Sequence, residues 1–405
     1  MNNIIKILKT FLYSDWGKLF LIAVLWQGIM TLFGAFSEAS TFGIFKNDHL
    51  PPNPTTLLSH TYHWDSAWYK SIVEEWYRIN AASPVFYPLF PLLVSLVHTI
   101  SFGAIGILAS GLLVNTMALW LALVALLQIA DHFVPKKYRW YIPLLFLTAP
   151  TAVFMHFFYG EAVFCAVGFW AYNFALKRRW LAMGLTLGLL TAARLPSILF
   201  IGLCALEYAR SYNWQLRGIF NKRILFFGLS LIGFLTYGLY LAIVRKDFFA
   251  MFNGYKASND WPYQIFNPNV IETWFNATRE LRTTLTTSVP FDEGFAVNYL
   301  LPLSGIALLL ISSLILLAHY GTRRYKGVGI PLGVFGIVCA IFFSLNSNLI
   351  SVDRYLLPCL SLYICGGLLA VKYPSVKYIL GLMIYLGILL QAYLLILFTN
   401  GYFAG

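Results

Sequence analysis

The sequence predicts an all-α polytopic membrane protein, and its composition is the main reason. Hydrophobic residues make up 59% of the 405 positions and charged residues 11%, whereas a soluble domain carries about 25% charged residues. The mean hydropathy is +0.71. These values exclude a soluble globular enzyme, a disordered chain and a disulfide scaffold. At about 20 residues per crossing, the chain has room for ten or more spans and one sizeable loop.

Basic residues set the orientation of these spans. The formal net charge is +12. Short basic clusters separate the apolar runs: Lys136, Lys137 and Arg139; Lys177, Arg178 and Arg179; Arg217, Lys222 and Arg223; Arg323, Arg324 and Lys326. Cytoplasmic loops have this distribution under the positive-inside rule. The sequence contains no basic stripe interleaved with aromatic residues, so we expect no nucleic-acid partner. The five cysteines lack metal-ligand spacing and are expected to be buried apolar residues.

Apolar runs follow one another along most of the chain. They lie near residues 17–37, 86–101, 104–130, 139–156, 160–177, 181–209, 223–245, 297–319, 328–346, 353–371 and 376–399. Within the first run, the apolar stretch from about Leu19 to Phe36 follows Lys6, Lys9 and Lys18 and is too long for the apolar region of a signal peptide. We therefore expect a retained first span with a cytoplasmic N-terminus.

Two of these runs are not expected to be simple crossings. Run 86–101 begins with Phe86-Tyr87-Pro88-Leu89-Phe90-Pro91, and its two prolines favour a re-entrant or interfacial element. Run 181–209 contains Arg194-Leu195-Pro196. An arginine at the bilayer centre costs at least ~2.5–3.5 kcal/mol, and proline biases its predecessor out of a helix. We predict two short helices that meet at Arg194 in a polar cavity. About 11 transmembrane helices result, with every basic cluster cytoplasmic and the C-terminus outside.

This topology gathers the unusual polar segments on the non-cytoplasmic face. Residues 38–103 form a first external loop with interfacial or re-entrant helices, and residues 246–296 form a long external loop. The turns near 156–161 and 346–354 lie on the same face, within a single membrane domain, 1–405. Loops as long as 246–296 usually have a functional role or are disordered. A site on this face is therefore expected.

The first external loop contains a candidate base. Trp64, Trp68, Ile72 and Trp76 recur at four-residue steps and predict one apolar face of an interfacial helix. Asp65 lies at the start of this helix, where the helix dipole favours a carboxylate. Two interpretations stay open for Asp65: it caps the helix, or it is a general base for an acceptor hydroxyl.

Three further charged residues are candidates. Glu161 opens an apolar run and is either an interfacial carboxylate at a helix N-terminus, an acceptor-orienting group or a metal contact. Arg194 lies deep in an apolar run and either pairs with a carboxylate or binds an anion. Arg354 follows Asp353, so a local ion pair is the alternative to a ligand-binding role.

Five ordered motifs resemble those of the PIG-V family, the mannosyltransferases of glycosylphosphatidylinositol assembly and their prokaryotic relatives. They are His63-Trp64-Asp65-Ser66-Ala67-Trp68-Tyr69, Tyr87-Pro88-Leu89-Phe90-Pro91-Leu92-Leu93, Tyr159-Gly160-Glu161-Ala162-Val163-Phe164, Thr191-Ala192-Ala193-Arg194 and Arg354-Tyr355-Leu356-Leu357-Pro358. The likeness covers residues 60 to 358 approximately. This chain departs from the family pattern at Gly160 and Ala162, and at Leu195-Pro196 after the arginine.

The resemblance implies a GT-C glycosyltransferase fold and an inverting sugar transfer from a polyprenyl- or dolichyl-phosphate donor. It implies that Asp65 is the catalytic base, that Arg194 and Arg354 pair with the donor phosphate, and that a glycolipid or glycan supplies the acceptor hydroxyl. The substrate-binding set is then His63, Trp64, Tyr69, Tyr159, Glu161, Arg194, Arg354 and Tyr355. No metal ligands are expected, although a divalent cation stays open as a cofactor because some relatives of this fold bind one.

The cellular setting follows from the same reasoning. We expect a multi-pass protein in a lipid bilayer, namely the plasma membrane of a bacterium or archaeon, or the endoplasmic reticulum if the source is a eukaryote. The active site is expected on the non-cytoplasmic face. The alternative is a lipid or solute transporter or flippase, which would place ionisable residues near the midplane of several spans and show inverted repeats.

Overall fold

The computed structural model describes residues 10–40, 56–78, 82–257, 266–286, 294–322 and 327–405. Within these ranges the chain is helical and forms no β-strand, which confirms the predicted all-α class. The basic cluster at 323–326 and parts of both predicted external loops lie outside the described residues.

Five of the described helices are long and apolar enough to cross a bilayer. They are α2 (Asp15–Ala39), α5 (Ile107–Ala130), η4 with α11 (Lys222–Ser230 and Leu231–Arg245), α14 with its flanking turns (Val297–Tyr320) and α18 (Val376–Thr399). Shorter apolar helices are α4 (Leu89–Ile100), α7 (Glu161–Leu176), α8 (Trp180–Thr191), α15 (Gly329–Phe343) and α17 (Leu360–Lys372). Because these are shorter than the roughly 20 residues of a simple span, the count of about 11 crossings stays a prediction.

The remaining helical segments connect or cover these helices. They are η1 (Ser59–Thr61), α3 (Asp65–Glu75), η2 (Ser83–Val85), α6 (Tyr141–Leu147), η3 (Pro150–Met155), α9 (Ser197–Ser211), α10 (Leu216–Ile219), α12 (Ala250–Ala257), α13 (Val270–Thr286) and α16 (Val352–Leu356). All five cysteines are buried and free, as the sequence predicted.

Prolines divide three of the predicted apolar runs. Run 181–209 breaks between α8 and α9 at Arg194 and Pro196, as expected. Run 139–156, expected to be continuous, instead divides into α6 and η3 at Pro150. Run 353–371 likewise divides into α16 and α17 at Pro358. Each break follows from the missing N–H of proline and its restriction of the preceding residue.

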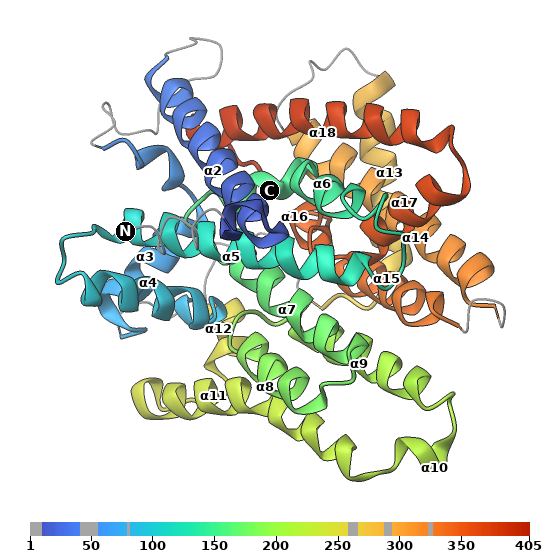
Figure 1. Ribbon diagram of the computed structural model, residues 1–405. Helices are drawn as coiled ribbons and strands as arrows, with labels where there is room; N and C mark the ends of the chain where they lie inside the picture. The colour runs from blue at the N-terminus through green and yellow to red at the C-terminus, as the bar shows by residue number, and fades with distance from the viewer. Residues whose placement is uncertain (1–9, 41–55, 79–81, 258–265, 287–293, 323–326) are drawn as a thin grey trace.

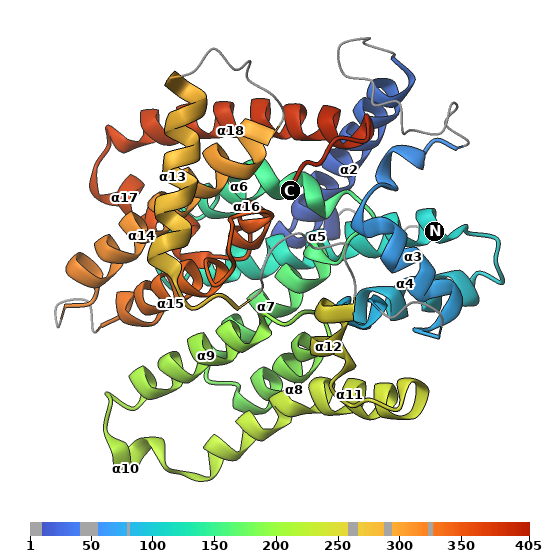
Figure 2. The same ribbon diagram turned by 180° about the vertical axis from the view of Figure 1, so that it is seen from behind.

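The helices are arranged in layers around α5 and α7 (Figures 1 and 2). α5 packs on α2, α4 and α7, while α7 also contacts α8 and α9. α8 to α11 form a layer on one side of α5 and α7, and α18 crosses the opposite side, where it contacts α2 and η3. The elements at the three proline breaks therefore lie close to α7: α8, α9 and η3 contact it directly, and α16 contacts η3.

Close backbone contact fixes the end of α8 near Arg194. A Cβ atom at Gly233 of α11 would lie 2.1 Å from the carbonyl oxygen of Gly188 in α8. Only glycine permits this approach, and small residues at helix crossings are typical of membrane proteins. Thr191, at the end of α8, donates from Oγ1 to the Ser230 carbonyl at 2.7 Å.

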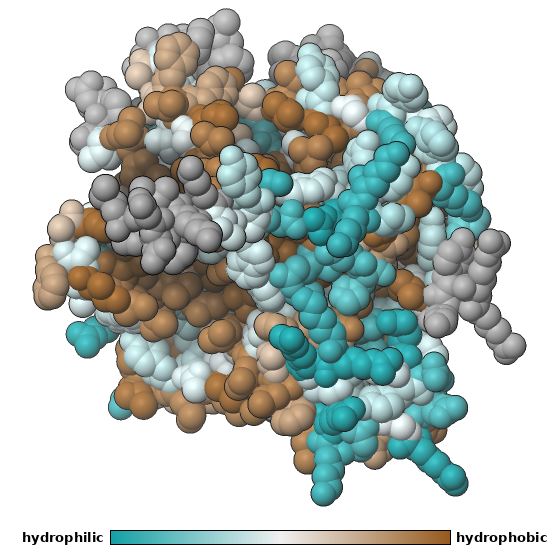
Figure 3. Space-filling model, viewed as in Figure 1, coloured by the Kyte–Doolittle hydropathy of each residue, from teal (hydrophilic) through white to brown (hydrophobic). Residues whose placement is uncertain are grey.

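Arg139 and Lys177 lie at one end of the central helices. Arg139 pairs with Asp15 at 2.6 Å and so joins the start of α2 to the turn after α5. Lys177, at the end of α7, bonds Gln128 near the end of α5. Figure 3 shows hydrophilic side chains gathered in a band that runs down this face toward α10. The first residue of α7, Glu161, lies at the other end of the same helix.

Candidate active site

Asp65 is the first residue of α3, and Trp64 precedes it in the N-cap position. No side chain caps this helix by a hydrogen bond, so the interpretation of Asp65 as the cap is wrong. Trp64 has φ 54° and ψ −122°. A residue with a side chain rarely adopts such a conformation, and strain of this kind, about 1–3 kcal/mol, is typical of functional sites.

The predicted apolar face of this helix holds for Trp68 and Ile72, which pack on the core, and is wrong at its two ends. Trp64 and Trp76 both lie outside the helix with positive φ values, and Trp64 is 47% exposed. Four-residue spacing defines a face only if the helix is continuous through every position, which it is not here. The buried face consists of Ser66, Tyr69, Ile72 and Val73.

Arg354 of α16 lies between two carboxylates. Its Nη1 bonds Asp65 Oδ2 at 2.9 Å, and its Nε lies 3.3 Å from Glu161 Oε1. The Arg354 side chain is 5% exposed, whereas that of Asp65 is 29% exposed. The ion pairs of Arg354 therefore extend to distant residues and not to Asp353, which was the local alternative. Asp65 is the member of this group that solvent or a substrate reaches most easily.

Glu161 is shared by two arginines. Its Oε1 accepts from Arg194 Nη1 at 2.5 Å as well as facing Arg354. Glu161 is the first residue of α7, where the helix dipole favours a carboxylate. The break between α8 and α9 brings Arg194 to it, because the chain leaves the helix there. The predicted pairing of Arg194 with a carboxylate is confirmed, and it leaves the anion-binding role open.

Aromatic rings enclose both guanidinium groups. The Arg354 Cζ lies 5.3 Å from the Tyr159 ring centroid and 5.5 Å from that of Phe154. The Arg194 Cζ lies 5.0 Å from the Tyr355 ring centroid. Arginine over an aromatic face is held by a cation–π attraction and by the planar shape of both groups. The charges are thus fixed in place before any ligand arrives.

A small pocket opens beside these charges. Glu161, Arg194, Arg354 and Tyr355 provide its polar wall, and the apolar wall consists of Phe164, Cys165, Pro196, Phe343 and Pro358. The second oxygen of Glu161, Oε2, is buried and has no hydrogen-bond partner within the described structure. The pocket therefore brings two cations, one free acceptor and an apolar wall together.

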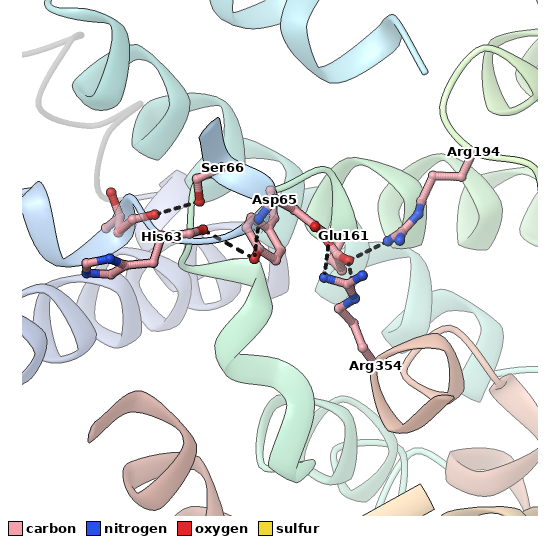
Figure 4. A network of polar contacts seen from close by, with 8 residues as sticks. His63, Asp65, Ser66, Glu161, Arg194 and Arg354 are labelled. Carbon is pink, nitrogen blue, oxygen red and sulfur yellow. Dashed lines mark hydrogen bonds and ion pairs between the residues drawn. The ribbon is translucent and has the colours of Figure 1, made fainter. Parts of the chain in front are cut away.

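The predicted site residues divide into two groups (Figure 4). Asp65, Glu161, Arg194 and Arg354 form one connected network, and Tyr355 lines the same pocket. The Tyr159 hydroxyl accepts from the Asp65 backbone N–H at 3.2 Å. The Tyr69 ring lies 6.3 Å from that of Tyr159.

His63 and Trp64 direct their side chains elsewhere. The His63 ring packs on Phe398 of α18, with centroids 5.4 Å apart, and burial lowers its pKa to about 4. Trp64 donates from Nε1 to the Tyr402 carbonyl at 3.0 Å. Their backbone atoms still position Asp65, but their side chains do not join the ionic network, which the motif alone could not indicate.

The two acids of the site, Asp65 and Glu161, are separated by an arginine. The described residues contain no group of three His, Cys, Asp or Glu side chains that could hold one. The Arg354 guanidinium occupies the space between Asp65 and Glu161. The expectation of no metal ligands and the alternative of a divalent cation both remain predictions.

Sequence reasoning missed the apolar part of the site. Phe154 and Phe343 belong to runs that were assigned to the bilayer. Cys165 was expected only to be buried. The aromatic run before Glu161 and the Pro358 break were the signals that could have placed Phe154 and the start of α17 here.

No protein-family model matches the chain, and no curated protein matches it in sequence. Among solved structures, the chain is similar to ArnT from Cupriavidus metallidurans bound to undecaprenyl phosphate. The TM-score is 0.52, the match covers 96% of this chain and 77% of ArnT, and the sequences are 14% identical. At this identity the likeness concerns the fold, and it confirms the predicted GT-C glycosyltransferase fold. The resemblance to the PIG-V family stays a prediction.

Proposed function

We propose that the chain is a membrane glycosyltransferase that moves a hexose from a polyprenyl- or dolichyl-phosphate donor to a hydroxyl of a lipid-linked or surface glycan. The carrying observation is the network of Asp65, Glu161, Arg194 and Arg354 around one pocket. The network combines a reachable carboxylate with two fixed cations, which are the groups that such a transfer requires.

The two arginines are assigned to the donor phosphate. Guanidinium groups pair with phosphate through two parallel hydrogen bonds. Arg194 uses Nη1 for Glu161 and, as a group with five donors, has others to offer on its pocket side. The apolar wall formed by Phe164, Phe343 and Pro358 suits the first units of a prenyl chain.

Asp65 is assigned as the general base of an inverting transfer. The acceptor hydroxyl attacks the sugar C1 while Asp65 takes its proton, and the C1–O bond to phosphate breaks with both electrons staying on the phosphate oxygen. The arginines stabilise the charge that develops on this oxygen. Because the leaving group is an anionic phosphate, the step needs no general acid.

Glu161 is assigned to orientation. Its Oε1 holds both arginines, and its Oε2 faces no donor of the described structure although it is buried. Leaving a buried carboxylate oxygen without a partner costs about 1–3 kcal/mol. A sugar hydroxyl in the pocket would donate to Oε2 and so recover this cost only when the donor is bound.

The sugar, the acceptor and the sidedness are parts of the same proposal. The motif resemblance favours mannose. The basic clusters at the far end of α7 from Glu161 favour a site on the non-cytoplasmic face under the positive-inside rule. No step of the proposed transfer requires a divalent cation, because the arginines supply the positive charge.

The test is transfer by the purified protein in lipid vesicles. We expect it to transfer mannose from synthetic polyprenyl-phosphate mannose to a glycolipid acceptor, with inversion at C1. A panel of polyprenyl-phosphate hexoses separates the general proposal from the choice of mannose. Movement of the intact donor across the bilayer without cleavage of the C1–O bond would support a flippase and contradict the proposal.

A further inference from the structure

A row of buried polar side chains joins three segments behind Asp65. His60 of η1 and His156 at the end of η3 face each other with their Nε2 atoms 2.9 Å apart. The Nδ1 of His156 lies 2.7 Å from Gln27 Oε1 on α2. The three side chains are at most 3% exposed. None of them belongs to the network of Asp65, Glu161, Arg194 and Arg354.

The hydrogen-bond partners at the two ends of this row determine which ring nitrogens carry a hydrogen. His60 Nδ1 lies 2.9 Å from the Leu57 carbonyl oxygen, which can only accept, so this nitrogen carries a hydrogen. Gln27 Nε2 donates to the Met155 carbonyl at 3.0 Å, which places the amide oxygen toward His156. The Nδ1 of His156 must therefore also carry a hydrogen. Both rings are committed to the same tautomer.

Two neutral imidazoles cannot complete the contact between them. A neutral ring carries one N–H, so the two Nε2 atoms would face each other as bare lone pairs. The ring centroids are 5.2 Å apart with an interplanar angle of 19°, so the rings meet end to end. A zinc ion between opposed nitrogens would need them about 4 Å apart. The 2.9 Å contact has room for a proton and not for a metal ion.

We propose that His60 and His156 bind one proton between them and that this proton fastens the segment before Asp65 to η3 and α2. The two histidines are then positioning residues for Asp65. The effect on transfer rests on the proposed function, whereas the binding of the proton does not.

The two segments that the histidines join lead directly into Asp65 and Glu161, the two acids of the site. Phe158 N–H donates to the Thr61 carbonyl at 3.1 Å, and Ser66 Oγ donates to the same oxygen at 3.1 Å. The Asp65 N–H donates to the Tyr159 hydroxyl at 3.2 Å. When the proton leaves, the opposed lone pairs push His60 away from His156, and the start of α3 shifts relative to the start of α7.

The surroundings contain few charges that compete for this proton. Glu38 on α2 accepts from Ser59 Oγ at 2.7 Å, next to His60, and its negative charge favours the proton. His63 follows on the same segment, and burial lowers the pKa values of His60 and His63 to about 4. α18 contributes Thr399 and Asn400, which are uncharged. Burial opposes the proton and the contact with His156 favours it, and in either case rising pH removes it.

The first measurement is histidine ¹⁵N NMR of the full chain in nanodiscs. Histidines titrate in proteins at about pH 4–8, and within this range we expect His60 and His156 to take up one proton with a common midpoint. His156→Gln should abolish this uptake, because the amide donates to His60 Nε2 without an added proton. The absence of any shared proton across the range would overturn the proposal, whatever the protein transfers.

The second measurement is the pH profile of transfer. Turnover should fall about tenfold as the pH rises through the midpoint, the factor that one charged hydrogen bond supplies. His156→Gln should remove this fall, and the control His98→Gln, which alters a bond to the Ile105 carbonyl beyond α4, should keep it. Gly34→Ala places a methyl carbon 2.3 Å from His60 Cδ2 and should move the midpoint. An unchanged profile in both His156→Gln and Gly34→Ala would overturn the positioning role.

Discussion

Replacing Glu161 by glutamine separates donor binding from catalysis. The change removes the charge that both arginines share and keeps the size of the side chain. Arg354 retains its bond to Asp65 at 2.9 Å, and Arg194 is partly exposed, so neither cation becomes an isolated buried charge. We therefore expect the variant to fold.

The magnitude follows from the geometry. A phosphate on the pocket side of Arg194 lies about 5 Å from the Glu161 carboxylate, because one guanidinium separates them. Two like charges at this distance repel by about 3 kcal/mol at an effective dielectric constant of about 20. Glu161→Gln removes this repulsion. The amide also holds the arginines less firmly, and we take this to offset roughly half of the gain in phosphate binding. The remaining ~1.4 kcal/mol corresponds to about tenfold tighter binding of a polyprenyl phosphate.

The assay compares binding and turnover in the same preparation. The Kd for undecaprenyl phosphate in nanodiscs should fall about tenfold in Glu161→Gln, while kcat falls at least tenfold because Oε2 no longer orients the sugar as a carboxylate. Glu207→Gln is the matched control, since Glu207 is also buried and pairs with Arg210 at 2.5 Å. Weaker or unchanged binding of the phosphate in Glu161→Gln would refute the reasoning.

Three further predictions address the cations and the topology. Arg194→Ala should weaken donor binding at least tenfold and Arg194→Lys somewhat less, since lysine keeps the charge and loses the paired geometry; equal donor affinity in all three proteins would exclude Arg194 as a phosphate ligand. Arg354→Met should lower the free energy of unfolding by about 3 kcal/mol, as expected when one partner of a buried ion pair is removed, and a change under 1 kcal/mol in chemical denaturation would contradict its buried pairing. A cysteine at Glu280 should react with an impermeant reagent from outside and one at Arg178 should not, against a background of buried native cysteines; the reverse pattern would invert the topology.

The broad fold was predictable from the sequence because composition and proline positions have direct physical consequences. Low charge content predicted the membrane helices, and Pro196 predicted the break that carries Arg194. The breaks at Pro150 and Pro358 obey the same rule. They were not predicted, because each of these runs is long enough to be a continuous span. The exact helix lengths depend on tertiary packing and were not predictable.

The ionic part of the site was predictable, whereas its geometry was not. Asp65, Glu161, Arg194 and Arg354 were singled out because charges among apolar residues are costly, and the structure brings these four together. The position of Arg354 between the two acids depends on contacts across 289 positions of sequence. The position of Trp64, which lies outside α3, likewise depends on a distant contact, with the Tyr402 carbonyl.

The central claim is that Asp65 removes the proton of an acceptor hydroxyl. Its most direct test is single-turnover transfer by Asp65→Asn, with donor affinity measured in parallel and with Asp131→Asn, another aspartate paired with an arginine, as the control. General-base catalysis contributes about 10²–10⁴-fold. The account predicts a loss of this size in the transfer rate of Asp65→Asn, with the donor still bound and Asp131→Asn unaffected. A transfer rate within a few-fold of the unmodified protein would contradict it.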